Sequence, residues 1–137
     1  MGKVNRNQLM SAALKARERA CAPYSKFKVG AALLTVSGKI IPGANVESAS
    51  YGLTCCAERV ALFRALTSGE KDFSAIAVTA RLKGGAMPCG ACRQLLAEYA
   101  PTAVVWVSDS AQPKEVREYN VMDLLPGAFR DFRPPSI

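Results

Sequence analysis

The chain has 137 residues, half of them hydrophobic, so its length fits one domain over residues 1–137 that can bury a core. The net charge is +7, but the basic residues are scattered with no run of three, which argues against binding a nucleic-acid polymer. The N-terminus lacks the apolar segment of a secretory signal, and no apolar run approaches the roughly 18 residues that span a membrane, so we expect a cytoplasmic location and no membrane partner.

The first third of the chain predicts a helix followed by a hairpin. Apolar residues at helical spacing predict an amphipathic helix from about Asn5 to Cys21, which Pro23 would end. Two runs rich in apolar and β-branched residues follow, at Phe27–Val36 and Lys39–Val46. The Ser37-Gly38 turn signal between them predicts that they pair as strands.

The rest of the chain predicts alternating helices and strands. A helix starting at Thr54 or Cys55 and ending near Thr67 precedes a buried strand at Phe73–Ala80. A third helix then begins with Pro88 at its first position. The remaining elements are that helix to Tyr99, a buried strand at Ala103–Val107, an edge strand at Val116–Val121 and a short helix at Met122–Leu125. This order predicts an α/β domain with helices packed on a mixed sheet, and it leaves the tail from Arg130 to Ile137 without an assignment.

Cysteine usage points to metal or catalytic chemistry. The five cysteines are an odd number in a chain without an export signal, which argues against a disulfide framework. The chain has no histidine, so a metal site must use thiolates or carboxylates. Cys21 is expected to be structural.

Two short motifs bring metal ligands to predicted helix N-termini. Cys89 and Cys92 lie three residues apart after Pro88, so they share a helix face and can bind one ion. Cys56 would join them from the neighbouring helix. Helix N-termini favour thiolates, and three thiolates with an open fourth position are the arrangement of catalytic zinc. We therefore expect one zinc ion per chain, although Cys89 and Cys92 alone are also compatible with a structural zinc knuckle or a redox pair.

Three charged residues follow these ligands directly. Glu58, two residues past Cys56, would take a proton from the water that zinc activates and pass it to the ring nitrogen and the leaving amine of a base. Arg59 and Arg93 are expected to donate to the ligand thiolates and offset the negative charge of a zinc ion with three thiolates. Cys-x-Glu followed by Pro-Cys-x-x-Cys is the all-cysteine form of the zinc nucleobase deaminase signature. Taken alone, Glu58 would be a residue that the helix dipole favours in a first turn.

Beyond these motifs, several segments carry a family resemblance. With them the chain resembles the small, homotetrameric type of cytidine deaminase; the segments are Tyr24–Ala32, Gly43–Thr54, Cys56–Arg59, Pro88–Gln94 and Leu124–Phe129. The resemblance implies a three-layer α/β/α sandwich with a mixed sheet of about five strands, and a homotetramer. It also implies hydrolysis of cytidine and 2′-deoxycytidine, by attack of water at C4, to uridine and 2′-deoxyuridine.

The resemblance further implies roles for residues outside the zinc motifs. Phe27 would lie near the pyrimidine, and Asn45 and Glu47 would hydrogen-bond the ribose, chiefly its 3′-hydroxyl. Tyr51 and Phe129 would complete the pocket of a neighbouring subunit. Cys55 departs from the family pattern, and we expect it to be a small buried hydrophobe rather than a fourth ligand.

Two other functions remain open at this point. One is a deaminase of the same fold that acts on a cytosine-containing antibiotic or on a base within RNA. The other is a zinc-stabilised binding module without catalysis. Hydrogen bonds from the protein to the 3′-hydroxyl favour a free nucleoside as the substrate, because they leave no room for a nucleic-acid chain to continue from that position.

Overall fold

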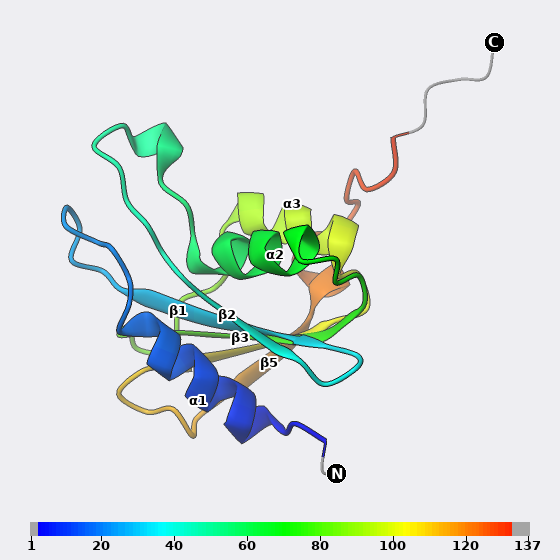
Figure 1. The fold of residues 1–137 in the computed structure, drawn as a ribbon, viewed down its shortest axis with the longest axis horizontal. Coiled ribbons are helices and arrows are strands. Elements are labelled where there is room, and N and C mark those ends of the chain that lie inside the picture. Colours follow the sequence, from blue (N-terminus) through cyan, green and yellow to red (C-terminus); the bar gives the residue numbers. More distant parts are fainter. Residues whose placement is uncertain (1–2, 133–137) are drawn as a thin grey trace.

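A mixed sheet of five strands lies at the centre of the molecule, in the order β2-β1-β3-β4-β5 (Figure 1). The computed structural model describes residues 3–132; residues 1–2 and 133–137, including both ends of the predicted domain and part of the unassigned tail, lie outside the described residues. The strands are β1 Val29–Thr35, β2 Ile40–Ala44, β3 Phe73–Ala80, β4 Val104–Asp109 and β5 Arg117–Asn120. β3 and β4 run parallel, whereas the other neighbouring pairs are antiparallel.

One face of the sheet is covered by α1, Arg6–Arg17. Asn5 starts this helix with a capping box, accepting a hydrogen bond from the backbone N–H of Gln8. The helix ends four residues before the predicted Cys21, because Cys21 pairs with the segment after β2 instead. The backbone N–H of Cys21 donates to the Asn45 carbonyl over 2.9 Å. The apolar stripe of α1 is buried against β1 and β3, through Leu9, Met10, Ala13, Ala32, Leu34, Ala75 and Ala77.

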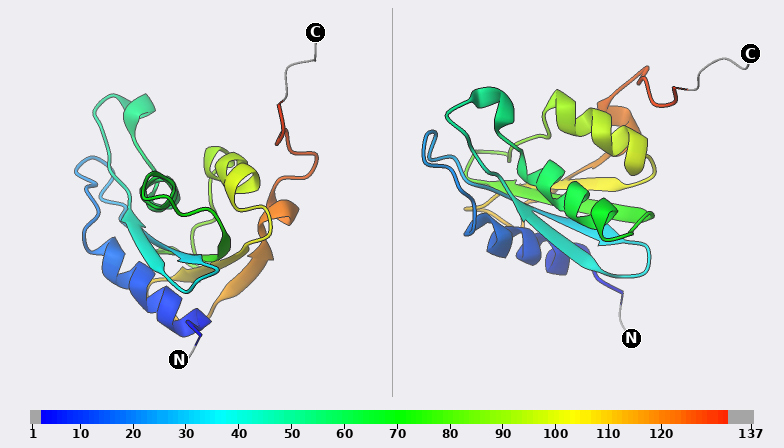
Figure 2. Two further views of the ribbon diagram at one scale, coloured as in Figure 1. Left: turned by 45° about the vertical axis from the view of Figure 1, so that its right-hand side comes forward. Right: turned by 45° about the horizontal axis from the view of Figure 1, so that its top comes forward.

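The opposite face is covered by α2, Ala57–Thr67, and α3, Gly90–Tyr99, which lie beside each other in both views of Figure 2. Between these helices and the sheet lies the larger core, whose fully buried side chains include Leu33, Leu62, Ile76, Val78 and Leu96. The three-layer α/β/α arrangement and the mixed five-stranded sheet are therefore confirmed. Two short 3₁₀ helices, Tyr51–Leu53 and Val121–Leu124, complete the fold.

Two glycines let the helices approach the sheet closely. A Cβ atom on Gly30 would lie 2.0 Å from the carbonyl oxygen of Ala13 in α1. A Cβ atom on Gly43 would lie 2.4 Å from the backbone nitrogen of Ala61 in α2. Because both contacts involve helix backbone, larger residues would push α1 and α2 away from the sheet.

Both helices above the sheet begin later than the sequence predicts. Cys56 and Cys89 are the N-cap residues of α2 and α3, each with an extended backbone. Pro88 consequently lies before the cap rather than at the first helical position. The shift matters for function, since it puts two cysteines at the positive ends of two helices.

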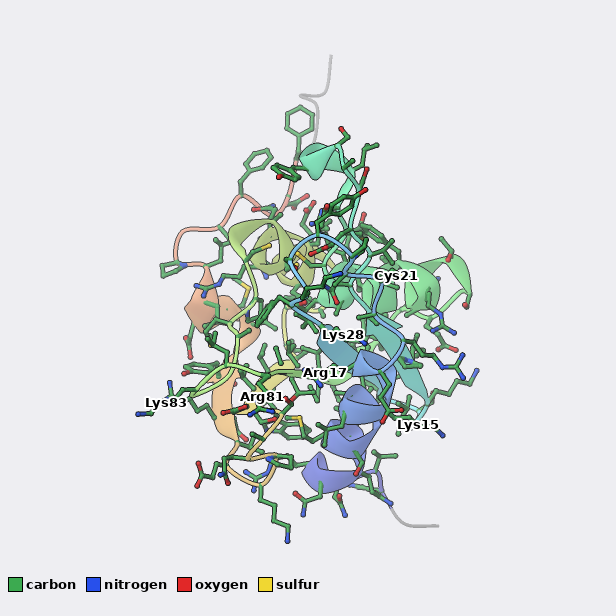
Figure 3. The ribbon with its side chains drawn as sticks, turned by 90° about the vertical axis from the view of Figure 1, so that its left-hand side faces the viewer. Lys15, Arg17, Cys21, Lys28, Arg81 and Lys83 are labelled. Carbon is green, nitrogen blue, oxygen red and sulfur yellow. The ribbon has the colours of Figure 1, made fainter. Side chains whose placement is uncertain are left out.

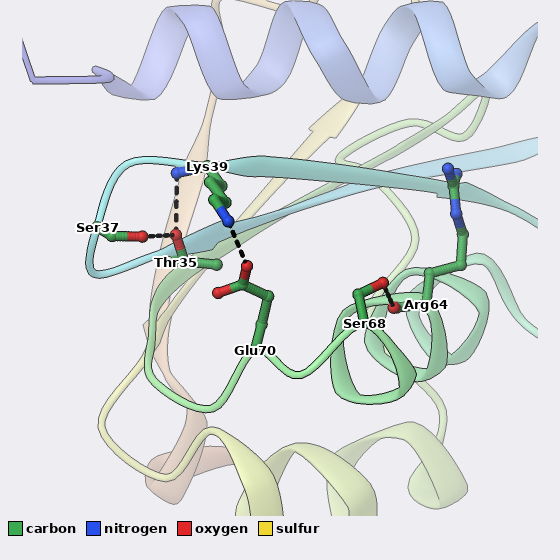
Figure 4. A network of polar contacts seen from close by, with 6 residues as sticks. All are labelled: Thr35, Ser37, Lys39, Arg64, Ser68 and Glu70. Carbon is green, nitrogen blue, oxygen red and sulfur yellow. Dashed lines mark hydrogen bonds and ion pairs between the residues drawn. The ribbon is translucent and has the colours of Figure 1, made fainter.

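The two ends of the sheet differ in character. At the end with the β1–β2 turn, side chains are linked by polar contacts, which include the 2.9 Å ion pair between Lys39 Nζ and Glu70 (Figure 4). At the other end, Lys28 precedes β1 and Arg81 follows the paired end of β3. Arg17 joins them there, and its Nε atom donates to the Lys28 carbonyl over 3.1 Å (Figure 3). This positively charged end also carries Phe27. None of the helices in residues 3–132 has the length and apolar character needed to cross a membrane.

Candidate metal centre and adjoining cavity

Three sulfur atoms meet where α2 and α3 begin. The Sγ atoms of Cys56, Cys89 and Cys92 all lie within 4.8 Å of one another. The Cys56–Cys89 distance is 3.7 Å and the Cys89–Cys92 distance is 3.5 Å. Tetrahedral zinc with Zn–S bonds of about 2.3 Å holds its sulfurs roughly 3.8 Å apart, so the group fits one zinc ion.

The other two cysteines lie outside this group. Cys55 is half-buried, and its backbone pairs with Val46 through two hydrogen bonds of 2.8 and 3.0 Å. Burial raises the pKa of its thiol. Cys21 is exposed and pairs with the same Val46 from the other side. Both cysteines therefore brace the segment that follows β2.

Two of the three clustered thiols, Cys56 and Cys92, have pKa values shifted in opposite directions. A hydrogen bond from Cys92, together with donation from Arg59, lowers the pKa of Cys56 to about 5. The same hydrogen bond to the Cys56 thiolate raises the pKa of Cys92. The two shifts therefore favour the thiolate at Cys56 and the protonated thiol at Cys92. A bound cation would displace the remaining protons, as thiolate coordination requires.

The two arginines have different partners. Nη2 of Arg59 donates to Sγ of Cys56 over 3.4 Å and to the Thr54 carbonyl over the same distance. Arg93 instead donates to two backbone carbonyls, those of Pro88 at 2.8 Å and Leu124 at 3.1 Å. The structure thus gives Arg93 partners other than the thiolates we expected. Its side chain points from α3 toward the C-terminal segment, where carbonyls at the end of the second 3₁₀ helix need donors.

Glu58 lies in the first turn of α2, next to the sulfurs but outside their group. Its side chain is only 5% exposed. Burial raises the pKa of this carboxyl to about 7, and the nearby Cys56 adds to the effect. Because this carboxyl is buried beside a potential metal site and its pKa is raised to about 7, it is suited to proton transfer.

A cavity of about 220 Å³ adjoins the sulfurs and Glu58. Its wall mixes apolar side chains with a few polar ones, as binding sites for small organic molecules do. The lining residues are Phe27, Val29, Asn45, Thr54, Cys55, Cys56, Ala57, Glu58, Val78, Ala86, Met87 and Cys89. A second cavity of about 370 Å³ lies beside it and shares Thr54. Tyr24, Ser25, Glu47, Ser48 and Tyr51 line the rest of that second cavity.

Asn45 and Glu47 both lie beyond the end of β2, although the predicted strand reached Val46. β2 ends at Ala44, so both residues lie in the segment that Val46 anchors by its bridges to Cys21 and Cys55. Asn45 is buried at the first cavity, whereas Glu47 lines the second. The two cavities adjoin, so both side chains can still contact different parts of one ligand.

The polar atoms of both residues already bind the loop that carries Phe27. Oδ1 of Asn45 accepts from the Val29 N–H over 2.8 Å, and its Nδ2 donates to the Phe27 carbonyl over 2.9 Å. Oε1 of Glu47 accepts from the N–H groups of Tyr24 and Ser25, both over 3.0 Å. Oε2 of Glu47 accepts from the Ser25 hydroxyl, and this hydrogen bond lowers the pKa of the carboxyl.

The two aromatic residues expected at a neighbouring subunit are exposed. Tyr51 is 84% and Phe129 68% exposed, so neither belongs to the core of its own chain. The side-chain amide of Gln94 in α3 donates to the Phe129 carbonyl over 2.5 Å and holds this segment on the helix. Neither Gln94 nor Ser25 had been singled out from the sequence. Both lie inside segments that carry the family resemblance, which is the signal that points to them.

Comparisons with known proteins agree with this site. Residues 3–108 match the family model for the cytidine and deoxycytidylate deaminase zinc-binding region. A cytidine deaminase of Halalkalibacterium halodurans is 51% identical over 126 residues, which cover 92% of this chain and 95% of that protein.

Solved structures give the same relationship. The crystal structure of a cytidine deaminase from Burkholderia pseudomallei superposes with a TM-score of 0.88 at 50% identity, covering 92% of this chain and all of that one. A cytidine deaminase from Mycobacterium tuberculosis superposes with a TM-score of 0.79 at 37% identity, covering 93% of this chain and 98% of that one.

Proposed function

The chain belongs to the cytidine and deoxycytidylate deaminase zinc-binding family, and on that premise we propose that it hydrolyses free cytidine and 2′-deoxycytidine. The products would be uridine and 2′-deoxyuridine, with ammonia released. Zinc is the metal of this family, and Cys56, Cys89 and Cys92 would hold one ion. The cytoplasmic location expected from the sequence stays a prediction.

The observation that carries this proposal is the position of Glu58. A buried carboxyl lies beside three sulfurs within 4.8 Å of one another, and it lines the same cavity as Phe27. Burying a carboxyl costs free energy, and a structural zinc knuckle gains nothing from it, so the buried Glu58 indicates a functional site. This argument favours an enzyme over a binding module.

The chemistry then follows from the groups around the cavity. Cys56, Cys89 and Cys92 would hold a zinc ion, which would supply the Lewis acid that activates water for attack on C4 of the pyrimidine. Glu58 would accept one proton from this water and deliver it to the ring nitrogen, and it would then carry the second water proton, which is lost as the C4 carbonyl forms, to the leaving amino group. Arg59 and the N-termini of α2 and α3 stabilise the thiolates, which offsets the net negative charge of the cluster.

Recognition of the nucleoside uses the two adjoining cavities. The pyrimidine occupies the cavity with Phe27 and Glu58, and the ribose reaches toward Asn45 and Glu47. The carboxylate of Glu47 accepts three hydrogen bonds from the protein, so one of its roughly four acceptor sites stays available for a ribose hydroxyl. A nucleic-acid chain continuing from the 3′-oxygen would not fit this arrangement.

The functional unit that we propose is a homotetramer. The exposed rings of Tyr51 and Phe129 support it, since large aromatic side chains that stay this exposed in their own chain are typical of interfaces. Each would cover the open side of a neighbour's cavity and exclude water from it. Closed symmetry with four such contacts is most simply D₂.

A substrate panel tests the proposed reaction. Purified protein would be assayed with cytidine, 2′-deoxycytidine, a cytosine-containing antibiotic and a short cytidine-containing oligonucleotide, with ammonia release as the measurement. We expect turnover of the two nucleosides and little of the oligonucleotide. Preference for the antibiotic or the oligonucleotide would replace the proposed substrate, and no turnover of any would favour the binding module.

A further inference from the structure

Residues 24–28 form a loop that brings Phe27 to the wall of the first cavity. The side chains of Asn45 and Glu47 make five hydrogen bonds to the segment from Tyr24 to Val29. The loop is therefore held by Asn45 and Glu47, the same two residues that the family resemblance implies as ribose-binding.

Within this loop, one hydroxyl joins the two halves of the site. Ser25 Oγ donates to Oε2 of Glu47, and it accepts a hydrogen bond from the Phe27 N–H over 2.9 Å. A serine hydroxyl has a single hydrogen, so donation to the carboxylate leaves its lone pairs to receive the Phe27 N–H. The bond to the carboxylate is charge-assisted, which makes it one of the stronger kinds.

We propose that Ser25 is a positioning residue, which sets Phe27 against the base and Glu47 toward the ribose by binding both at once. This inference rests on the proposed function, because it assumes that the nucleoside occupies the two adjoining cavities. Ser25 itself is not assigned a contact with the reacting atoms.

The backbone next to Ser25 explains why the loop must be held. Lys26 has a φ of 62°, the only positive φ of a non-glycine residue among residues 3–132. Such a conformation is uncommon for a residue with a Cβ atom and persists where surrounding contacts enforce it. Lys26 is exposed, so packing of its side chain does not enforce it. The contacts that do are the hydrogen bond from the Lys26 N–H to the Ala22 carbonyl over 3.0 Å, the Ser25 hydroxyl bonds on one side and the Asn45 amide bonds on the other.

The test is a set of serine variants assayed for cytidine turnover. Ser25→Ala removes both hydroxyl bonds, so we expect the KM for cytidine to rise about tenfold while kcat stays within about twofold. Ser25→Thr keeps the hydroxyl and should retain a KM within about threefold of the wild type. Ser37→Ala is the matched control, because the Ser37 hydroxyl bonds Thr35 over 2.9 Å at the opposite end of the sheet. It should leave both constants unchanged.

A double-mutant cycle with Phe27→Ala tests whether the rise in KM in Ser25→Ala depends on Phe27. If Ser25 positions Phe27 and Glu47 together, Ser25→Ala should raise KM by clearly less than about tenfold further in the Phe27→Ala background, because only its effect through Glu47 remains there. A second full tenfold loss there would overturn the proposal, as would an unchanged KM in the single variant. Loss of zinc would make Ser25 a support of the fold, and a kcat that falls as much as kcat/KM would give it a role in the transition state; either result would overturn the proposal. Failure of the proposed function is distinguishable, because the wild-type protein itself would then leave cytidine unchanged.

Discussion

The guanidinium of Arg59 donates a hydrogen bond to the sulfur of Cys56 over 3.4 Å. Both residues belong to the start of α2, where Cys56 is the N-cap. The interaction raises the pKa of Arg59 and lowers that of Cys56, so it favours the ion pair of guanidinium and thiolate. A zinc ion with three thiolates carries a net charge of −1, which weakens its ability to acidify water. Arg59 is the side chain that withdraws negative charge from one of those sulfurs.

Replacing this arginine should therefore impair both metal binding and catalysis. We expect Arg59→Gln to lower zinc affinity or kcat about 10- to 100-fold, the usual effect of losing an outer-shell partner. Arg93→Gln is the matched control, because Arg93 donates to carbonyls of Pro88 and Leu124 rather than to sulfur. It should lower the melting temperature while leaving zinc affinity near that of the wild type. Equal zinc affinity and kcat in Arg59→Gln would exclude the role given to Arg59.

Glu58→Gln tests proton transfer. The variant should keep its zinc and its fold and lose activity by at least about 10²-fold, because an amide cannot carry a proton from water to the base. Zinc content, a melting curve and the rate with cytidine are measured on one preparation. Glu18→Gln, at the exposed end of α1, controls for loss of an acidic side chain and should be fully active. If Glu58→Gln loses zinc, Glu58 is a ligand and the proposed role is wrong.

The ribose contacts predict an order among substrates. Free cytosine should be far poorer than cytidine, because binding energy from the sugar is used to position the reacting ring. 3′-Deoxycytidine should lose more in kcat/KM than 2′-deoxycytidine, about 10- to 100-fold, since its missing hydroxyl leaves the remaining acceptor site of the charged Glu47 without a donor. Steady-state kinetics with the four compounds measures this order. Equal turnover of all of them would remove Asn45 and Glu47 from the substrate site.

Phe129 predicts a link between assembly and activity. Light scattering should give a homotetramer, and Phe129→Ala should both weaken the assembly and raise KM, because the ring would close a neighbour's cavity. Leu82→Ala serves as the control, since Leu82 is a half-exposed apolar residue in the loop after β3. It should change neither property. A monomer with full activity at assay concentration would contradict this prediction.

Secondary structure was predictable where local pattern and tertiary packing agree. β3 has the bounds expected from its dense run of apolar residues, Phe73–Ala80, because both faces of this central strand are buried. The starts of α2 and α3 were predicted two or three residues too early, since the extended N-cap backbone of Cys56 and Cys89 depends on contacts between distant segments. The end of α1 was missed for a similar reason: the bridge between Cys21 and Val46 has no local signal.

The sequence predicted which residues belong to the candidate site better than it predicted their hydrogen-bond partners. Cys56 and Cys89 lie 33 positions apart in the chain, yet the motif alone indicated that they share one site. By contrast, nothing in the residue pattern separates Arg59, which reaches a sulfur, from Arg93, which reaches carbonyls. Such differences depend on side-chain direction across the fold. The same holds for Ser25, whose hydroxyl matters only because Glu47 lies within reach of it.

The most direct test of the whole account is zinc content measured together with cytidine deamination in one preparation. We expect about one zinc per chain, loss of uridine formation when a chelator removes it, and recovery when zinc is restored. Cys56→Ser, Cys89→Ser and Cys92→Ser should each abolish both zinc binding and activity, whereas Cys21→Ser should retain both. A zinc-free preparation that still converts cytidine to uridine would contradict the account.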